Sequence, residues 1–251
     1  TYYANFHKKI KKATKLDIKV GLIVGFFMFL GFATQTIGLE YTTVGVQAFL
    51  TASNVVMVPF LYWIICKKRP DNFEILGAIL CFLGIGILSL DSSLYVGIGE
   101  FLSFLCAICF AFQIVAVGYF AKDVDPYILS VVQLSLATIL SFICAFLFEP
   151  KIAEFNTNMI IPIVYLGIFS TLIAFLIQNI AQKYTSSTHA AIILSLEAVF
   201  GSIIAIIFLK EEVTVKFLIG CMTIFISVLA SETKFEFLNK EKRTINQGDG
   251  S

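Results

Sequence analysis

The residues best able to do chemistry in this 251-residue chain are a few polar side chains inside long apolar segments. Glu197 is the most informative, because it lies nine positions into the apolar segment 189–209. An ionisable group inside a membrane span is costly and marks a solute site or a proton relay. We therefore treat Glu197 as the proton-coupling candidate and as one solute-binding candidate. A carboxyl group that only hydrogen-bonds a neighbouring helix is the alternative, and the sequence favours neither.

Amide and hydroxyl side chains in other apolar segments form a second set of candidates. Amides donate and accept hydrogen bonds, which suits neutral or zwitterionic solutes. For any single residue a bond between helices is the better interpretation, although such bonds contribute only about 0.6–2 kcal/mol in membranes. For the whole set we favour solute binding, because polar stripes recur in corresponding parts of the chain. The set consists of Gln35, Thr51, Asn54, Gln113, Gln133, Gln178 and Asn179.

Helical spacing groups several of these residues on common faces. Thr171, Ala174 and Gln178 fall at positions i, i+3 and i+7 of one segment. A second stripe, at i, i+4 and i+7, consists of Gln47, Thr51 and Asn54. Side chains with this spacing share one side of a regular α-helix. We therefore expect each stripe to face the interior of a helical bundle.

The segments that hold these residues are long and apolar enough to cross a membrane. The chain is 58% hydrophobic and 14% charged, with a mean hydropathy of +0.90, whereas soluble domains have about a quarter charged residues. A spanning helix needs about 20 mainly apolar residues. The predicted fold class is an all-α integral membrane protein, a polytopic helical bundle. Its eight predicted spans are 20–37, 44–66, 73–90, 96–120, 126–148, 159–181, 189–209 and 214–231.

Lys and Arg residues gather at the two ends of the chain and in every second loop. Positive residues in short loops mark the cytoplasmic side of a membrane. Only Lys151, Lys210 and Lys216 of the eighteen Lys and Arg residues fall on the opposite side. We therefore expect a multi-pass protein of the cell membrane (inner or plasma) with both termini in the cytoplasm.

The chain contains an internal repeat. A shift of 143 residues aligns 20–88 with 163–231 without a gap and makes twelve positions identical. The two copies start five spans apart, and an odd number of spans gives them opposite orientations. Inverted repeats of this kind are typical of secondary transporters. The polar or glycine identities include Gln35/Gln178, Tyr41/Tyr184, Thr42/Thr185, Lys67/Lys210 and Gly77/Gly220.

The two copies differ in length. Residues 1–90 hold only three spans of a first repeat, residues 96–231 hold five spans of a second, and 232–251 form a cytoplasmic tail. Two spans of the first repeat are therefore expected upstream of Thr1. We predict a natural chain of ten spans in a 5+5 arrangement that begins before this residue.

Several short motifs resemble the drug/metabolite transporter superfamily, in particular its EamA-type exporters. They are the Tyr-Thr turn in Gly38-Leu-Glu-Tyr-Thr-Thr43, the run Ala48-Phe-Leu-Thr-Ala-Ser-Asn-Val-Val-Met-Val-Pro59, the pattern Leu194-Ser-Leu-Glu-Ala-Val-Phe200 and the acidic pair in Phe208-Leu-Lys-Glu-Glu212. The resemblance extends over residues 18–231. It implies export of small metabolites such as amino acids or their derivatives.

Other chemistry finds little support in the sequence. No P-loop, Ser-His-Asp set, HExxH motif or pair of intramembrane aspartates occurs, and only His7 and His189 are histidines. Cys106 and Cys109 form a CxxC inside an apolar segment, where small helix-interior residues are the better interpretation. We expect no cofactor, no metal and no enzymatic activity. The expected partners are a small-molecule solute and the lipid bilayer but no nucleic acid, with a homodimer as one option.

Two backbone signals concern packing. Gly21 and Gly25 form a GxxxG pattern that permits close contact between helices. Pro59 inside the segment 44–66 is expected to bend that helix.

The combined interpretation is a secondary transporter that moves small polar solutes by alternating access. A non-transporting membrane assembly subunit is the main alternative. A lipid-handling protein or an intramembrane enzyme is less well supported, because the sequence offers no nucleophile–base pair or metal ligands at mid-span.

Overall fold

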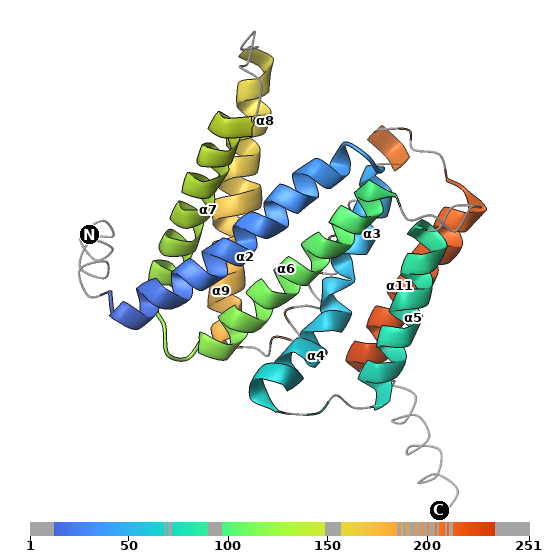
Figure 1. Cartoon of the computed structure of the whole chain (residues 1–251), viewed down its shortest axis with the longest axis horizontal. Coiled ribbons are helices and arrows are strands. Elements are labelled where there is room, and N and C mark those ends of the chain that lie inside the picture. The colour runs from blue at the N-terminus through green and yellow to red at the C-terminus, as the bar shows by residue number, and fades with distance from the viewer. Residues whose placement is uncertain are drawn as a thin grey trace, which may run out of the picture. The chain divides into compact units, whose positions relative to one another are not determined.

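Helices form the regular structure of every part of the chain that the computed structural model describes (Figure 1). The described residues are 13–67, 69, 72–89, 97–148, 157–184, 187, 190, 194, 197, 200, 204, 206–208, 210 and 213–233. The elements are α2 (Lys15–Leu39), α3 (Val44–Ala52), α4 (Asn54–Cys66), α5 (Asn72–Ser89), α6 (Ile98–Phe120), α7 (Pro126–Phe148), η1 (Thr157–Met159), α8 (Ile160–Tyr165), η2 (Leu166–Ile173), α9 (Ala174–Tyr184) and α11 (Val215–Thr233).

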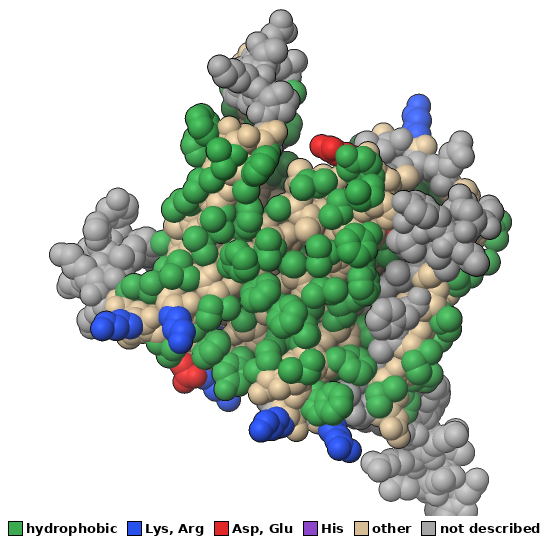
Figure 2. Space-filling view, in the orientation of Figure 1, with side chains coloured by type: hydrophobic (Ala, Val, Ile, Leu, Met, Phe, Trp, Pro, Cys, Tyr) green, Lys and Arg blue, Asp and Glu red, His purple; other side chains and the backbone are tan. Residues whose placement is uncertain are grey.

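Five of these helical stretches are long and apolar enough to cross a membrane, and the shorter stretch Val215–Ser227 is also apolar. The five are Lys15–Leu39, Val44–Ile65, Ile98–Phe120, Pro126–Phe148 and Ile160–Tyr184. Hydrophobic side chains cover the helices in Figure 2, whereas Lys and Arg side chains are drawn at helix ends. The predicted all-α polytopic class is therefore confirmed. Most of the predicted span 189–209 lies outside the described residues.

The described residues separate into two compact units. The first unit comprises residues up to Ala33 together with Phe112–Ala190, and the second comprises Thr34–Ala111 together with the residues from Ala191 onward. Helices α2 and α6 contribute residues to both units. This division differs from the predicted repeats 1–90 and 96–231, because each unit takes helices from both of them.

In the first unit, two glycines bring α2 against α7. A Cβ atom on Gly21 would stand 2.6 Å from the Val132 side chain, and one on Gly25 would stand 2.7 Å from the Gln133 carbonyl oxygen. Only a residue without a side chain fits at these distances, so the GxxxG pattern does permit close contact here. A buried cluster that includes Val20, Val24 and Leu129 lies in the same unit.

A buried carboxylate joins the start of α2 to the loop between α6 and α7. Asp17 is 3% exposed, and its carboxylate accepts hydrogen bonds from the Thr14 backbone N–H (2.8 Å), the Thr14 hydroxyl (2.7 Å) and the Asp125 backbone N–H (2.9 Å). The Thr14 hydroxyl oxygen in turn accepts a bond from the Asp17 backbone N–H at 3.1 Å. This reciprocal pairing is a capping box. The bond to Asp125 holds the α2 start and this loop at one end of the first unit.

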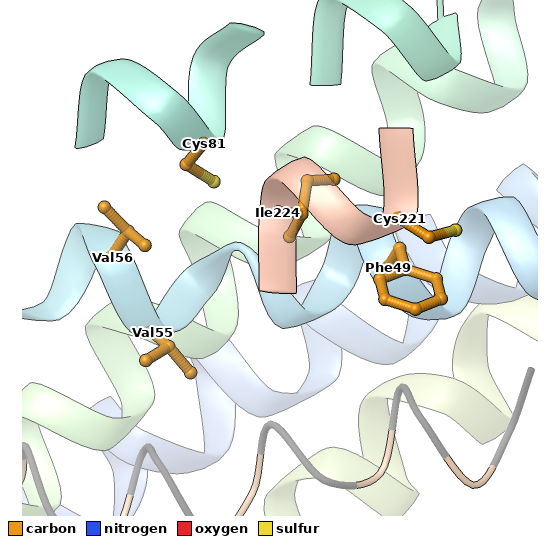
Figure 3. Packing of buried hydrophobic residues seen from close by; sticks show 6 residues of the cluster. All are labelled: Phe49, Val55, Val56, Cys81, Cys221 and Ile224. Atoms are coloured by element: carbon orange, nitrogen blue, oxygen red, sulfur yellow. The ribbon is translucent and has the colours of Figure 1, made fainter. Parts of the chain in front are cut away.

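The second unit has its own apolar core. Figure 3 shows Phe49 of α3, Val55 and Val56 of α4, Cys81 of α5, and Cys221 and Ile224 of α11 packed together. Helices α5 and α11 lie side by side, and a Cβ atom on Gly84 would stand 2.6 Å from the Ile224 side chain. The small residue therefore sets the separation between these two helices.

The span that contains α3 and α4 is interrupted at Ser53. The Ser53 hydroxyl donates to the Leu50 carbonyl oxygen at 2.6 Å, and its backbone N–H bonds the same carbonyl at 3.2 Å. A serine hydroxyl that bonds back to the preceding turn competes with the regular helical pattern. Pro59, where the sequence predicts a bend, lies inside α4, and that bend stays a prediction.

Two lysines in the described residues adopt left-handed backbone conformations. Lys67 has φ of 57° and caps α4, where its backbone N–H bonds the Trp63 carbonyl oxygen at 2.7 Å, and Lys210 has φ of 54°. Positive φ is uncommon for a residue with a side chain. These positions are equivalent under the 143-residue shift, so the two copies share a backbone feature as well as a residue type.

Substituting Gly25 tests the close contact between α2 and α7. We expect Gly25→Ala to lower the free energy of unfolding by about 1–3 kcal/mol, because the new methyl group would overlap the Gln133 backbone. Reversible unfolding in mixed micelles measures the change. Gly167→Ala is the matched control, since a Cβ atom there meets nothing within 4 Å. Equal effects of the two substitutions would contradict the packing argument.

Candidate functional site

Buried polar side chains from three helices meet inside the first unit. Helix α6 contributes Gln113, α7 contributes Ser130 and Gln133, and α9 contributes Gln178, Asn179 and Gln182. We call these six residues the amide cluster. All of them except Gln178 are no more than 3% exposed.

Hydrogen bonds from α9 involve every member of the amide cluster except Gln133. The Gln178 side-chain amide donates to Gln113 Oε1 at 3.2 Å, and the Asn179 amide donates to Ser130 Oγ at 2.8 Å. The Gln182 amide donates to the Ile114 carbonyl oxygen at 3.2 Å. Residues 178, 179 and 182 therefore bond to α6 and α7 at once. The cluster is a junction of three helices.

Five polar atoms of the amide cluster are buried without a hydrogen-bond partner. They are Gln113 Nε2, both side-chain polar atoms of Gln133, Asn179 Oδ1 and Gln182 Oε1. Leaving a buried polar group unpaired costs about 1–3 kcal/mol. Such a group in a folded protein indicates an unseen partner or a functional role. The unpaired atoms of the amide cluster therefore require partners that donate and accept hydrogen bonds.

The orientations of two amides follow from their neighbours. The Ser130 hydroxyl donates its proton to the Pro126 carbonyl oxygen at 2.7 Å, so Ser130 Oγ can only accept from Asn179. The Ile114 carbonyl oxygen is likewise only an acceptor for Gln182. In both amides the nitrogen must make the bond, and the oxygen must be the unpaired atom.

A change of helix type precedes α9. Residues Leu166–Ile173 form the π-helical segment η2, in which the Thr171 hydroxyl donates to the Leu166 carbonyl oxygen at 2.9 Å. The sequence predicted that Thr171, Ala174 and Gln178 share the inner face, but Ala174 is exposed. The buried face carries Asn179 and Gln182 instead. Ala174 and Gln178 both lie in the regular helix α9, so the difference concerns which face of α9 is buried and not the spacing of these two residues.

Helix α7 presents its polar residues from a firmly capped start. The Asp125 carboxylate accepts a hydrogen bond from the Tyr127 backbone N–H at 2.9 Å, as an N-cap residue does. Ser130 and Gln133 follow three residues apart and so lie on neighbouring positions of one face. Helix α2 covers the Gln133 backbone at Gly25. Gln133 is consequently 0% exposed.

The remaining sequence-predicted residues belong to the second unit. The Gln47 side-chain amide donates to the Gln35 carbonyl oxygen, and the Thr51 hydroxyl donates to Cys106 Sγ at 3.9 Å. Asn54 is 8% exposed and its Oδ1 has no hydrogen-bond partner. These contacts place the polar stripe of α3 against the end of α2 and the first half of α6.

Glu197 also belongs to the second unit. Its backbone is helical and the residue is exposed.

The structure divides the predicted site residues into two sets and adds new members. The first unit contains Gln113, Gln133, Gln178 and Asn179, and the second contains Gln35, Thr51, Asn54 and Glu197. Sequence reasoning missed Ser130 and Gln182. Their signal was present, because each stands three residues from a predicted amide on the same helix.

A polytopic helical membrane protein with polar groups buried between its spans is the class that this architecture defines. The model of the EamA-like transporter family matches residues 2–90 and 97–232. The chain belongs to the EamA-like transporter family. It is a membrane transporter, and the predicted resemblance is confirmed.

Individual relatives agree with this assignment. An uncharacterized transporter of Archaeoglobus fulgidus is 34% identical over 213 residues, which cover 85% of this chain and 68% of the relative. An uncharacterized transporter of Clostridium kluyveri is 23% identical over 218 residues, which cover 83% and 70%. One solved crystal structure has a TM-score of 0.63 at 18% identity and covers 87% of this chain and 76% of its own. This last likeness concerns the fold alone.

Gln133→Met tests whether the Gln133 amide is unpaired in the solute-free protein. We expect the free energy of unfolding to rise by about 1–3 kcal/mol, because the substitution removes two unsatisfied polar atoms at similar volume. Unfolding in mixed micelles without added solute measures the effect. Ser130→Ala is the matched comparison on the same helix. It should lower stability, because it leaves the Asn179 amide nitrogen unpaired. A loss of stability in Gln133→Met would mean that a structural partner holds this amide.

Proposed function

We propose that this transporter moves small polar solutes, such as amino acids or their derivatives, out of the cell by alternating access. The observation that carries the proposal is the set of five unpaired polar atoms in the amide cluster. A transporter needs a site that binds its solute and then releases it, which requires moderate affinity. A few neutral hydrogen bonds provide such an affinity. Each such bond contributes about 0.5–1.5 kcal/mol net.

The polar residues of the second unit support a coupled mechanism. Asn54 lies directly after the interruption at Ser53, within the stretch Val44–Ile65. Interrupted spans hold the solute and coupling-ion sites of many secondary transporters. We propose that Glu197 takes up and releases a proton during transport, and that Gln35, Thr51 and Asn54 contribute to the solute path.

Hydrogen bonds near the helix ends support the proposed topology. In the first unit, the bond from Asp125 to Asp17 holds the loop that contains Lys122 beside the start of α2, where Lys15 and Lys19 lie. In the second unit, the Thr42 hydroxyl donates to Glu100 Oε1 at 2.9 Å. Each bond joins segments that the distribution of Lys and Arg assigns to one side. We propose that both termini face the cytoplasm of a cell with the protein in its plasma or inner membrane.

Solute release from proteoliposomes tests the transport function. The full chain is reconstituted with a panel of trapped amino acids and related metabolites, and release is compared with that from protein-free liposomes. We expect one solute class to leave faster in the presence of the protein. Release of that class should fall about tenfold in Asn179→Leu, which removes one unpaired acceptor and its bond to Ser130. No release of any solute would contradict the proposal.

Glu197→Gln tests proton coupling separately from solute binding. We expect transport by the wild-type protein to respond to an imposed pH gradient, because the Glu197 carboxyl group carries the proton. Transport by Glu197→Gln should proceed without this response, since an amide does not titrate near neutral pH. Efflux with and without the gradient measures both properties. A variant that keeps the full pH response would remove Glu197 from the mechanism.

A further inference from the structure

The unpaired atoms of the amide cluster are not all of one kind. Asn179 Oδ1 and Gln182 Oε1 are acceptors, because the partners of both amides fix their orientations. These residues lie three apart on α9, so their oxygens are on neighbouring positions of one face. A molecule held there must donate hydrogen bonds to two acceptors.

Gln133 adds a complementary requirement. Both of its side-chain polar atoms are unpaired, so it presents one donor group and one acceptor whichever way the amide is turned. A molecule that satisfies both side-chain polar atoms of Gln133 must therefore accept one hydrogen bond and donate another. An ammonium or guanidinium group cannot accept, and a carboxylate cannot donate.

The members of the amide cluster carry no net charge. An ion buried among neutral amides without a counter-ion is strongly disfavoured. Glutamine, asparagine and serine side chains can bond to an ion but cannot neutralise it. A neutral group that combines a carbonyl oxygen with an NH₂ group both donates and accepts hydrogen bonds and brings no charge into the cluster. Its two N–H groups can bond two of the three unpaired oxygens of Asn179, Gln182 and Gln133.

We infer that the amide cluster recognises a primary carboxamide group on the transported solute, with Gln133 as the residue that selects it. This inference rests on the proposed function and names the chemical class that the same site takes. Ser130 is a positioning residue, because its bond to Asn179 turns the unpaired Asn179 oxygen toward the solute. Phe175 lies four residues before Asn179 and packs edge-on against Phe32, with ring centroids 5.7 Å apart. This aromatic pair provides an apolar surface one helical turn from the cluster for the body of the solute.

Three compounds of nearly equal shape separate the relevant properties. Benzamide is neutral and both donates and accepts, benzoate is an anion that only accepts, and benzamidine is a cation that only donates. The full chain in lipid nanodiscs is incubated with radiolabelled benzamide, and the three unlabelled compounds compete for it. We expect benzamide to bind at least about tenfold more tightly than either ion, because one or two hydrogen bonds make a difference of this size. Failure to bind benzamide, or equal affinity for all three compounds, would overturn the inference.

Substitutions at Gln133 test its selecting role. Gln133→Glu should reverse the order and favour benzamidine over benzamide about tenfold, because a carboxylate bonds an amidinium group with two charge-assisted hydrogen bonds. Gln133→Met should weaken benzamide binding about tenfold, and it serves as the test if the glutamate variant does not fold. Ser135→Ala, at an exposed position of the same helix, is the control and should leave all affinities unchanged. If a bound water alone satisfied Gln133, benzamide affinity would be the same in Gln133→Met, and that result would also overturn the inference.

Counterflow of labelled benzamide in proteoliposomes separates this inference from the transport proposal. Selective binding with no counterflow would support the carboxamide site and contradict transport of this solute. If the protein transported other solutes and substitution of Gln133 left its selectivity unchanged, the transport function would be supported and the carboxamide site would be overturned.

Discussion

In a lipid bilayer the chain has no water to bond, so each polar group within a span must find its partner inside the protein or in a solute. Several hydroxyl groups of the described residues do so within their own helix. The Ser53, Ser130 and Thr171 hydroxyls donate to carbonyl oxygens of their own helices. Buried polar atoms without a partner are concentrated in the amide cluster. These atoms lower the stability of the fold unless a solute forms hydrogen bonds with them.

The rest of the first unit holds the amide cluster in place. Gly25 allows α2 to cover the Gln133 backbone, and Asp17 anchors the beginning of α2 to the loop before α7. Asp125 then caps α7, from which Ser130 and Gln133 project. The second unit has a different character, because its principal cluster of buried side chains is apolar and its polar stripe makes single contacts such as that of Thr51 with Cys106. Under the proposed function, the first unit recognises the solute and the second couples its movement to a proton.

Much of the fold could be predicted because membrane helices follow simple rules of length and polarity. The helices α6 and α7 fall within two residues of their predicted spans, and four of the six amide-cluster residues were named from their polarity alone. The interruption at Ser53 and the segment η2 could not be predicted by the same reasoning. Both depend on side-chain bonds to backbone carbonyls, which leave no mark on the apolar pattern. Sequence spacing also shows which residues share a face but not which face is buried, and in α9 the buried residues are Asn179 and Gln182 while Ala174 is exposed.

The segment η2 has a consequence for how this protein can change over time. A π-helical segment holds one more residue than the α-helical turns it replaces, so deleting one residue from Leu166–Ile173 would convert it into regular α-helix. The extra residue is taken up by the wider turn, so α8 and α9 would keep nearly the same faces after the deletion. A regular α-helix would instead turn by about 100° for each residue removed. The segment η2 is therefore a place where this span can lose one residue without turning the buried face of α9 away from its neighbours in the first unit.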